Sequence, residues 1–139
     1  MTEALRTKLQ ITNDSRLLKK ASRELIDILK DRGIGEETLF DVQAGFEEAL
    51  RNAMLHGNRL HPDKKVIVET EITFEQVTIS VEDEGEGFDP DSLPDPTLEE
   101  NLLKESGRGI YLIRHLMDRV RYENGGRRVV MTKYLKKRL

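Results

Sequence analysis

The chain has 139 residues, with 23 Lys and Arg against 26 Asp and Glu, and a formal net charge of -3 at pH 7. This length suits one domain of about 100–200 residues, so residues 1–139 are expected to form a single domain. The absence of cysteine excludes a disulfide framework, a thiolate metal site and a cysteine nucleophile. No apolar run approaches the ~20 residues of a membrane span, no signal peptide is visible, and the acidic balance argues against direct nucleic-acid binding, so we expect a cytoplasmic domain.

The first half of the chain predicts a strand followed by two helices. Residues 5–11 form the short strand, and residues 12–15 offer capping oxygens before an apolar repeat at helical spacing that ends near Gly33 and Gly35. The apolar positions of this first helix are Leu18, Ala21, Leu25, Ile28 and Leu29. A second helix starts near Glu36, where the helix dipole favours acidic residues, and stops around 56–58. Its apolar stripe consists of Leu39, Val42, Phe46, Ala49 or Leu50, and Ala53.

The second half predicts a hairpin, a long loop, a helix and two final strands. Residues 66–72 and 77–81 alternate between apolar and polar side chains, which indicates two half-buried antiparallel strands joined by a tight turn. Residues 82–105 are rich in proline and acids, and a loop this long is usually a lid, a binding loop or disordered. A helix over 110–117 follows. Strands around 120–122 and 128–135 are joined through Asn124-Gly125-Gly126.

This order of elements, βααββαββ, predicts an α+β fold. Adjacent strands joined by tight turns favour a mixed, mostly antiparallel sheet with the helices packed on one face. We therefore expect a two-layer sandwich of sheet and helices.

A first candidate functional group lies on the second predicted helix. Glu48, Asn52 and His56 are spaced four residues apart, so they share one helical face. A carboxylate, an amide and an imidazole would then form a polar ridge beside the apolar stripe. A solvated helix face explains these three residues equally well when they are considered alone.

Two glycine-containing groups follow. Asp83 with Gly85 and Gly87 comes directly after a strand, where glycines let the backbone approach a ligand and the carboxylate can accept from an exocyclic amine. A tight turn closing the strand would explain the same residues. The run Ser106-Gly107-Arg108-Gly109 opens the helix that continues from Ile110, and a helix N-terminus suits phosphate. A simple serine cap explains this run almost as well, and no Gly-Lys-Ser/Thr follows it as in a Walker P-loop.

Together, in this order, the three groups resemble the N box and the two glycine boxes of the GHKL ATP-binding superfamily. The N box is Glu48 to Asn58, the first glycine box is Asp83 to Gly87, and the second is Gly107 to Ile110. The compact size and the run SGRGIYLI over residues 106–113 are similar to one branch, the bacterial anti-sigma factor serine/threonine kinases. The resemblance covers nearly the whole chain. It implies the histidine kinase-like ATPase fold, with a flexible ATP lid over about 88–105.

The resemblance also implies a site that uses ATP and Mg²⁺. Glu48 would be the general base, Asn52 would hold Mg²⁺ at the phosphates, and Asp83 would accept from the adenine amino group. The cofactor-binding residues that it implies are Asn52, His56, Asp83, Gly85, Gly87, Ser106, Gly107, Arg108, Gly109 and Ile110. Glu47 competes with Glu48 for the role of base, and the four-residue spacing to Asn52 favours Glu48. Arg127 follows the late Gly125-Gly126 pair, where many relatives carry a threonine that can meet the nucleotide.

Glu48 also separates the possible reactions. A serine or water oxygen needs a base as it attacks, whereas an imidazole brings its own lone pair. The residue therefore favours transfer to a hydroxyl, or hydrolysis, over histidine phosphorylation. The implied function is an anti-sigma factor that binds a sigma factor and phosphorylates a STAS-type antagonist, and the resemblance is also compatible with a homodimer. The alternatives are a non-catalytic nucleotide-dependent protein-binding module, a stand-alone ATPase and a histidine kinase-type fragment.

Overall fold

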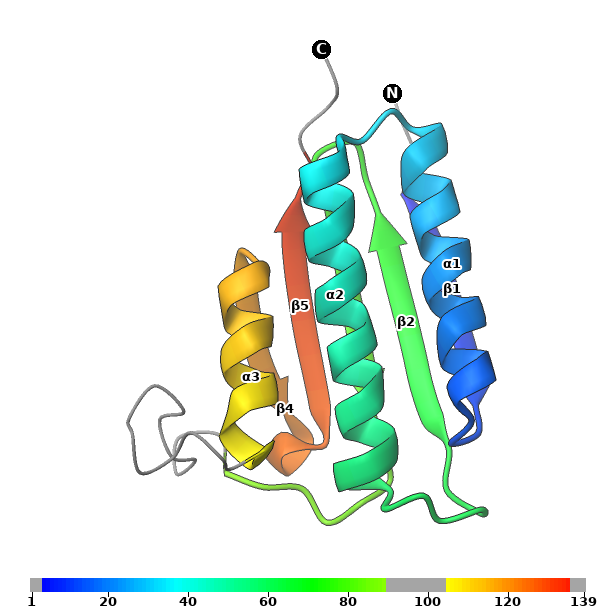
Figure 1. The fold of residues 1–139 in the computed structure, drawn as a ribbon, viewed down its shortest axis with the longest axis vertical. Helices are drawn as coiled ribbons and strands as arrows, with labels where there is room; N and C mark the ends of the chain where they lie inside the picture. The colour runs from blue at the N-terminus through cyan, green and yellow to red at the C-terminus, as the bar shows by residue number, and fades with distance from the viewer. Residues whose placement is uncertain (1–3, 90–104, 136–139) are drawn as a thin grey trace.

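Residues 4–89 and 105–135 are described by a computed structural model, without the side chains of 105–108. In this part of the chain the helices lie side by side on one face of a five-stranded sheet, with α2 between α1 and α3 (Figure 1). The predicted α+β two-layer fold is therefore confirmed. Most of the predicted lid over about 88–105 lies outside the described residues.

The sheet has the strand order β1-β2-β3-β5-β4. Its strands are β1 (Leu5–Ile11), β2 (Val66–Ile72), β3 (Gln76–Glu82), β4 (Arg119–Glu123) and β5 (Arg128–Tyr134). All four pairings are antiparallel, where the sequence predicted a mixed, mostly antiparallel sheet. The order of the last two strands explains the difference. β3 and β4 run in the same direction, but β5 lies between them and pairs antiparallel with both, so no parallel pair forms.

The helices are α1 (Ser15–Asp31), α2 (Glu36–Asn52) and α3 (Glu105–Leu116). Asp14 caps α1 by accepting a hydrogen bond from the Arg16 backbone N–H at 2.8 Å, and Gly33, at φ +78°, follows its end. The second predicted helix ends at Asn52 and continues as a single π-helical turn, η1 (Ala53–Gly57). α3 begins at Glu105, five residues before the predicted start at Ile110. The serine and two glycines of its first turn carry no apolar repeat, so the periodicity becomes visible only afterwards.

The hydrophobic core lies between the helices and the sheet. Phe46 and Leu50 of α2 are almost completely buried, as are Val68, Ile79 and Met131 on the facing strands. The predicted stripe of α1 is buried except at Ile28, which is only partly covered, whereas the neighbouring Ile26 is buried. α2 therefore packs over the centre of the sheet, which fixes the position of the polar residues along its exposed side. Within the described ranges, each helix is too short or too polar to cross a lipid bilayer.

Candidate nucleotide-binding site

A cavity of about 210 Å³ opens where the end of α2, the turn η1, the start of α3 and the ends of β3 and β5 meet. We call it the α2–α3 cavity. Its apolar lining consists of Ala49, Ala53, Val81, Phe88, Ile110, Ile113, Tyr122 and Val129. Its polar lining consists of Asn52, His56, Arg59, Asp83, Glu86 and Arg127, with Gly57, Gly87 and Gly126 completing the wall. Pockets for whole small molecules are about 300–1,000 Å³, so the described walls enclose only part of such a ligand.

The predicted polar ridge borders this cavity. Asn52 and His56 line it, and Glu48 lies one helical turn before Asn52, beside the start of α3. A Cβ atom added at Gly109 would lie 2.7 Å from Asn52 Nδ2 and 2.8 Å from Glu48 Oε1. The fold therefore brings the N box against the second glycine box, and it does so at a position where only glycine leaves room for both polar groups.

The remaining residues of the second glycine box are only partly described. Ile110 lines the α2–α3 cavity. The backbone of Ser106, Gly107 and Arg108 belongs to the first turn of α3, and their side chains lie outside the described residues. The first-turn N–H groups of a helix have no partner within the helix, so this segment suits an anion.

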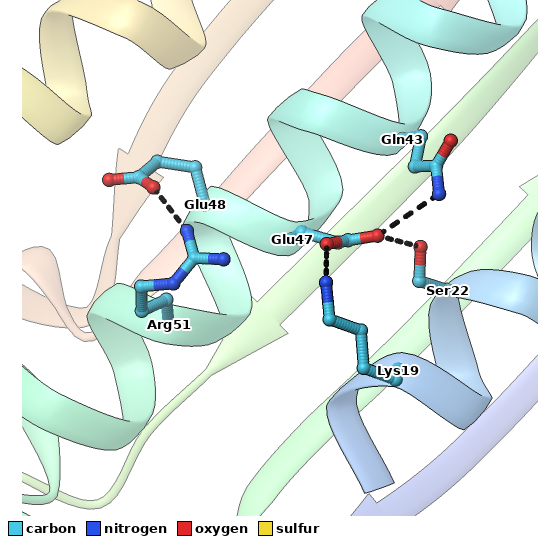
Figure 2. A network of polar contacts seen from close by, with 6 residues as sticks. All are labelled: Lys19, Ser22, Gln43, Glu47, Glu48 and Arg51. Atoms are coloured by element: carbon cyan, nitrogen blue, oxygen red, sulfur yellow. Dashed lines mark hydrogen bonds and ion pairs between the residues drawn. The ribbon is translucent and has the colours of Figure 1, made fainter. Parts of the chain in front are cut away.

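Glu47 and Glu48 differ sharply in their surroundings (Figure 2). Glu47 is buried between α1 and α2, where it accepts hydrogen bonds from Lys19 Nζ (2.8 Å), Ser22 Oγ (2.7 Å) and Gln43 Nε2 (3.2 Å). Burial alone would raise the pKa of the Glu47 carboxyl, but these hydrogen bonds and the Lys19 charge outweigh it and lower the pKa. Glu47 therefore fastens α1 to α2 and faces away from the α2–α3 cavity.

By contrast, one carboxylate oxygen of Glu48 is hydrogen-bonded, and the other is directed toward α3. Its Oε2 accepts a hydrogen bond from Arg51 Nη1 at 2.7 Å, and the two residues form an ion pair across one turn of the helix. Its Oε1 is the atom that lies near Gly109. Of the two adjacent glutamates, only Glu48 can contact a group bound at the start of α3.

The first glycine box is held by close backbone packing. Asp83 Oδ1 accepts a hydrogen bond from the Gly85 N–H at 2.8 Å. A Cβ at Gly57 would lie 2.3 Å from Asp83 Cγ, and one at Gly85 would lie 2.1 Å from the Gly57 carbonyl oxygen. Burial raises the pKa of the Asp83 carboxyl, an effect partly opposed by the Gly85 N–H and by the Arg127 charge. Gly85 is therefore needed behind the cavity wall, for packing against Gly57, while Asp83 lines the cavity itself.

Gly87 has a different role from Gly85, because it lines the α2–α3 cavity. It adopts φ +82°, and a Cβ there would lie 2.1 Å from the Gly125 carbonyl oxygen. The next residue, Phe88, donates its backbone N–H to the same oxygen at 2.8 Å. The first glycine box is thereby joined to the turn between β4 and β5.

Sequence analysis placed Asn58 at the end of a helix and of the N box but gave it no role in the site. Asn58 is 1% exposed, and its Nδ2 donates to Asn13 Oδ1 and to the Lys65 carbonyl, both at 3.0 Å. Its Oδ1 accepts from the Glu84 backbone N–H at 2.8 Å, inside the first glycine box. Asn58 therefore holds the turn η1, the start of β2 and the residue after Asp83 together. Its signals in the sequence were its place at the end of the N box and directly after a glycine at a helix end.

Sequence analysis also missed an aromatic pair in the cavity lining. Phe88 and Tyr122 meet edge to face with their ring centroids 5.4 Å apart, and the Arg114 guanidinium lies 5.8 Å from the Tyr122 centroid. Burial raises the pKa of Tyr122 to about 12, so this phenol stays neutral at physiological pH. These residues come from three distant segments, and no local pattern in the sequence connects them.

The donor set fits a nucleotide with magnesium. A largely apolar cavity with the Asp83 carboxylate in its lining suits a nucleobase that carries an amino group, and the start of α3 suits phosphates. No group of three His, Cys, Asp or Glu residues among those described could by itself hold a metal ion. Mg²⁺ commonly keeps its waters and binds through substrate phosphates with few protein ligands, which a single amide oxygen of Asn52 can satisfy.

The comparisons with known proteins agree with this geometry. Residues 11–133 match the family described as histidine kinase-like ATPase domain, and the chain belongs to this family. Within it, the chain is similar to serine-protein kinase RsbW of Bacillus subtilis (strain 168), with 32% identity over 112 residues, 74% of this chain and 69% of the relative. Serine-protein kinase RsbW of Staphylococcus aureus (strain Newman) is 30% identical over 121 residues, 81% of this chain and 76% of the relative. The predicted resemblance to anti-sigma factor serine kinases of this superfamily is thereby confirmed.

Proposed function

We propose that the chain is a cytoplasmic, single-domain protein serine/threonine kinase that uses ATP and Mg²⁺ and also acts as an anti-sigma factor. One observation carries the proposal. Glu48 and Asn52 meet Gly109 at the start of α3, beside a cavity that contains Asp83. Candidates for a general base, a metal ligand and an amine acceptor therefore surround one site near a helix start that suits an anion, which supports nucleotide binding there.

The adenine base of ATP would occupy the α2–α3 cavity with its amino group at Asp83. Asn52 would bind the metal ion, and the first turn of α3 would receive the phosphates through its free N–H groups. The nucleotide supplies the phosphoryl group, and the metal ion neutralises its charge. The protein's own contribution is to position the nucleotide and the metal ion and to exclude water from the adenine.

Glu48 would then act on the incoming hydroxyl. Its Oε1 is directed toward Gly109, so it can accept the proton of a serine or threonine as the oxygen attacks the phosphoryl group. The Arg51 guanidinium holds Oε2 at 2.7 Å and so fixes the direction of the carboxylate. A carboxylate base is not required when the acceptor is an imidazole, so Glu48 supports a hydroxyl acceptor.

The kind of substrate follows from the relatives, which are named serine-protein kinases, so we infer that the substrate of this chain is a protein. The resemblance to anti-sigma factor kinases implies that this protein is a STAS-type antagonist. The bound and sequestered partner would be a sigma factor, and a homodimer would be the working form. The presence of Glu48 and Asn52 beside Gly109 supports the kinase over the non-catalytic module, whereas Arg127 at the position of the family's threonine is the one feature among the described residues that favours the module.

The test is transfer of labelled phosphate from ATP to candidate STAS-domain proteins in the presence of Mg²⁺. We expect label on a serine or threonine, which survives acid treatment, whereas phosphohistidine does not. Acid-labile label would indicate the histidine kinase alternative, and release of phosphate without a labelled protein would indicate an ATPase. Nucleotide binding without either product would support the non-catalytic module.

A further inference from the structure

Asp83 and Arg127 lie directly opposite one another at the end of the sheet. In the antiparallel pairing of β3 and β5, Glu82 is opposite Arg128, and one residue further the Asp83 N–H donates to the Arg127 carbonyl at 3.0 Å. Asp83 and Arg127 are therefore backbone neighbours across the hydrogen bond that follows the last paired residues of the two strands. Both side chains line the α2–α3 cavity.

The two side chains offer complementary hydrogen-bonding groups. Asp83 Oδ1 accepts the Gly85 N–H, while no described residue donates to Oδ2. Arg127 Nη1 donates to the Gly85 carbonyl at 3.4 Å, which leaves the other N–H groups of its guanidinium available. The end of the cavity therefore presents an acceptor and a charged donor side by side.

We propose that Arg127 is a base-recognising residue that donates a hydrogen bond to N1 of adenine while Asp83 accepts one from the neighbouring amino group. This inference rests on the proposed function, because it concerns the same nucleotide. Adenine carries a donor at position 6 and an acceptor at position 1, which matches an acceptor beside a donor. Guanine in the same orientation would place its carbonyl against Asp83 and its N1–H against Arg127, so both contacts would be mismatched.

The test compares ADP with 1-deaza-ADP, in which N1 is replaced by a C–H group, by calorimetric titration. The proteins are the wild type, Arg127→Met, and Arg121→Met as the control, since Arg121 is an exposed arginine of β4 outside the cavity lining. We expect the wild type to bind ADP about tenfold or more tightly than 1-deaza-ADP, the size of one hydrogen bond to a charged group. That ratio should fall close to one in Arg127→Met and persist in Arg121→Met.

Two results would overturn the inference while leaving the proposed function intact. One is a wild type that binds both nucleotides equally well, a comparison that needs no variant to fold. The other is an Arg127→Met variant that binds ADP and keeps the wild-type ratio. A wild type that binds neither nucleotide would overturn the proposed function itself, and the recognition of adenine by Arg127 with it.

Discussion

The carboxylates of Glu47 and Glu48, neighbours in the sequence, leave α2 on opposite sides (Figure 2). Glu47 is hydrogen-bonded to Lys19 and Ser22 of α1, whereas Glu48 pairs with Arg51 and directs Oε1 toward Gly109 of α3. One residue of helix is a rotation of about 100°, which is enough to separate a contact between two helices from a contact with a ligand. The two residues therefore form a matched pair for mutagenesis.

Glu48→Gln should lower phosphoryl transfer by roughly 10²–10⁴-fold while leaving nucleotide affinity within a few-fold of the wild type. The amide keeps the shape of the side chain but cannot take up the hydroxyl proton. Transfer is measured with a cognate substrate protein, and affinity by calorimetric titration. Wild-type transfer by Glu48→Gln would show that Glu48 is not the base.

Glu47→Gln is the control and should show the opposite behaviour. It weakens a buried hydrogen-bond network between α1 and α2, so the free energy of unfolding should fall by about 1 kcal/mol. Transfer per folded molecule should be unchanged, because Glu47 faces away from the α2–α3 cavity. If Glu47→Gln loses transfer and Glu48→Gln does not, the assignment of the two residues is reversed.

The lowered pKa of Glu47 makes stability depend on pH in a defined direction. A carboxyl whose pKa is lower in the folded chain than in the unfolded chain stabilises the fold above its unfolded value, here 4.5. That stabilisation is lost as the pH falls through the folded pKa. In denaturant titrations at pH 6 and pH 3, the wild type should therefore lose more unfolding free energy than Glu47→Gln. An equal loss in both proteins would contradict the ionised network.

Gly109→Ala should impair function without impairing folding. Alanine is favoured over glycine in a helix by about 1 kcal/mol, so thermal stability should be unchanged or higher. The added Cβ would lie 2.7–2.8 Å from Asn52 and Glu48 and displace both side chains, so transfer should fall at least about tenfold. Activity and unfolding temperature are measured on the same preparation.

Gly45→Ala is the matched control for this substitution, because Gly45 is also helical. A Cβ there would meet Met117 Cε at 2.6 Å, the flexible end of a core side chain away from the α2–α3 cavity. Transfer by Gly45→Ala should stay within about twofold of the wild type. If both alanine variants lose activity equally, the contact of Gly109 with Glu48 and Asn52 is not the reason.

Asn58→Ala should destabilise the fold and loosen the first glycine box. It leaves the Glu84 N–H and the Lys65 carbonyl without their buried partner, at a cost of about 1–3 kcal/mol. Hydrogen exchange at the Glu84 amide should accelerate by more than the change in global stability explains. If the Glu84 amide exchanges no faster relative to the amides of the sheet than it does in the wild type, Asn58 does not hold this segment.

The strands and most of the helix boundaries could be predicted from the sequence, because they depend on local periodicity. Alternation of apolar and polar residues located Val66–Ile72 with its observed bounds, and the short mixed segment Leu5–Ile11 was also placed as a strand with its observed bounds. The match of Glu48, Asn52 and Gly109 to the N box and the second glycine box also identified residues that the fold brings together. In each case the pattern lies within a single element or in the order of elements.

What could not be predicted leaves no trace in the local apolar pattern. The start of α3 at Glu105 and the π-helical turn at Ala53–Gly57 change hydrogen bonding without changing that pattern. The other features depend on contacts between distant segments. The placement of Arg127 beside Asp83 follows from the register of β3 against β5, which the forty-three intervening positions do not encode locally. The same holds for the hydrogen bonds of Asn58 with Asn13 and Glu84.

The central claim, that the α2–α3 cavity and Asn52 bind a nucleotide with its metal ion, is tested most directly by calorimetry. The wild type and Asn52→Ala are titrated with ATP, with and without Mg²⁺. The account predicts binding by the wild type that Mg²⁺ strengthens, and a loss of most of that strengthening in Asn52→Ala. Binding that is equal in the two proteins and indifferent to Mg²⁺, or no binding at all, would contradict it.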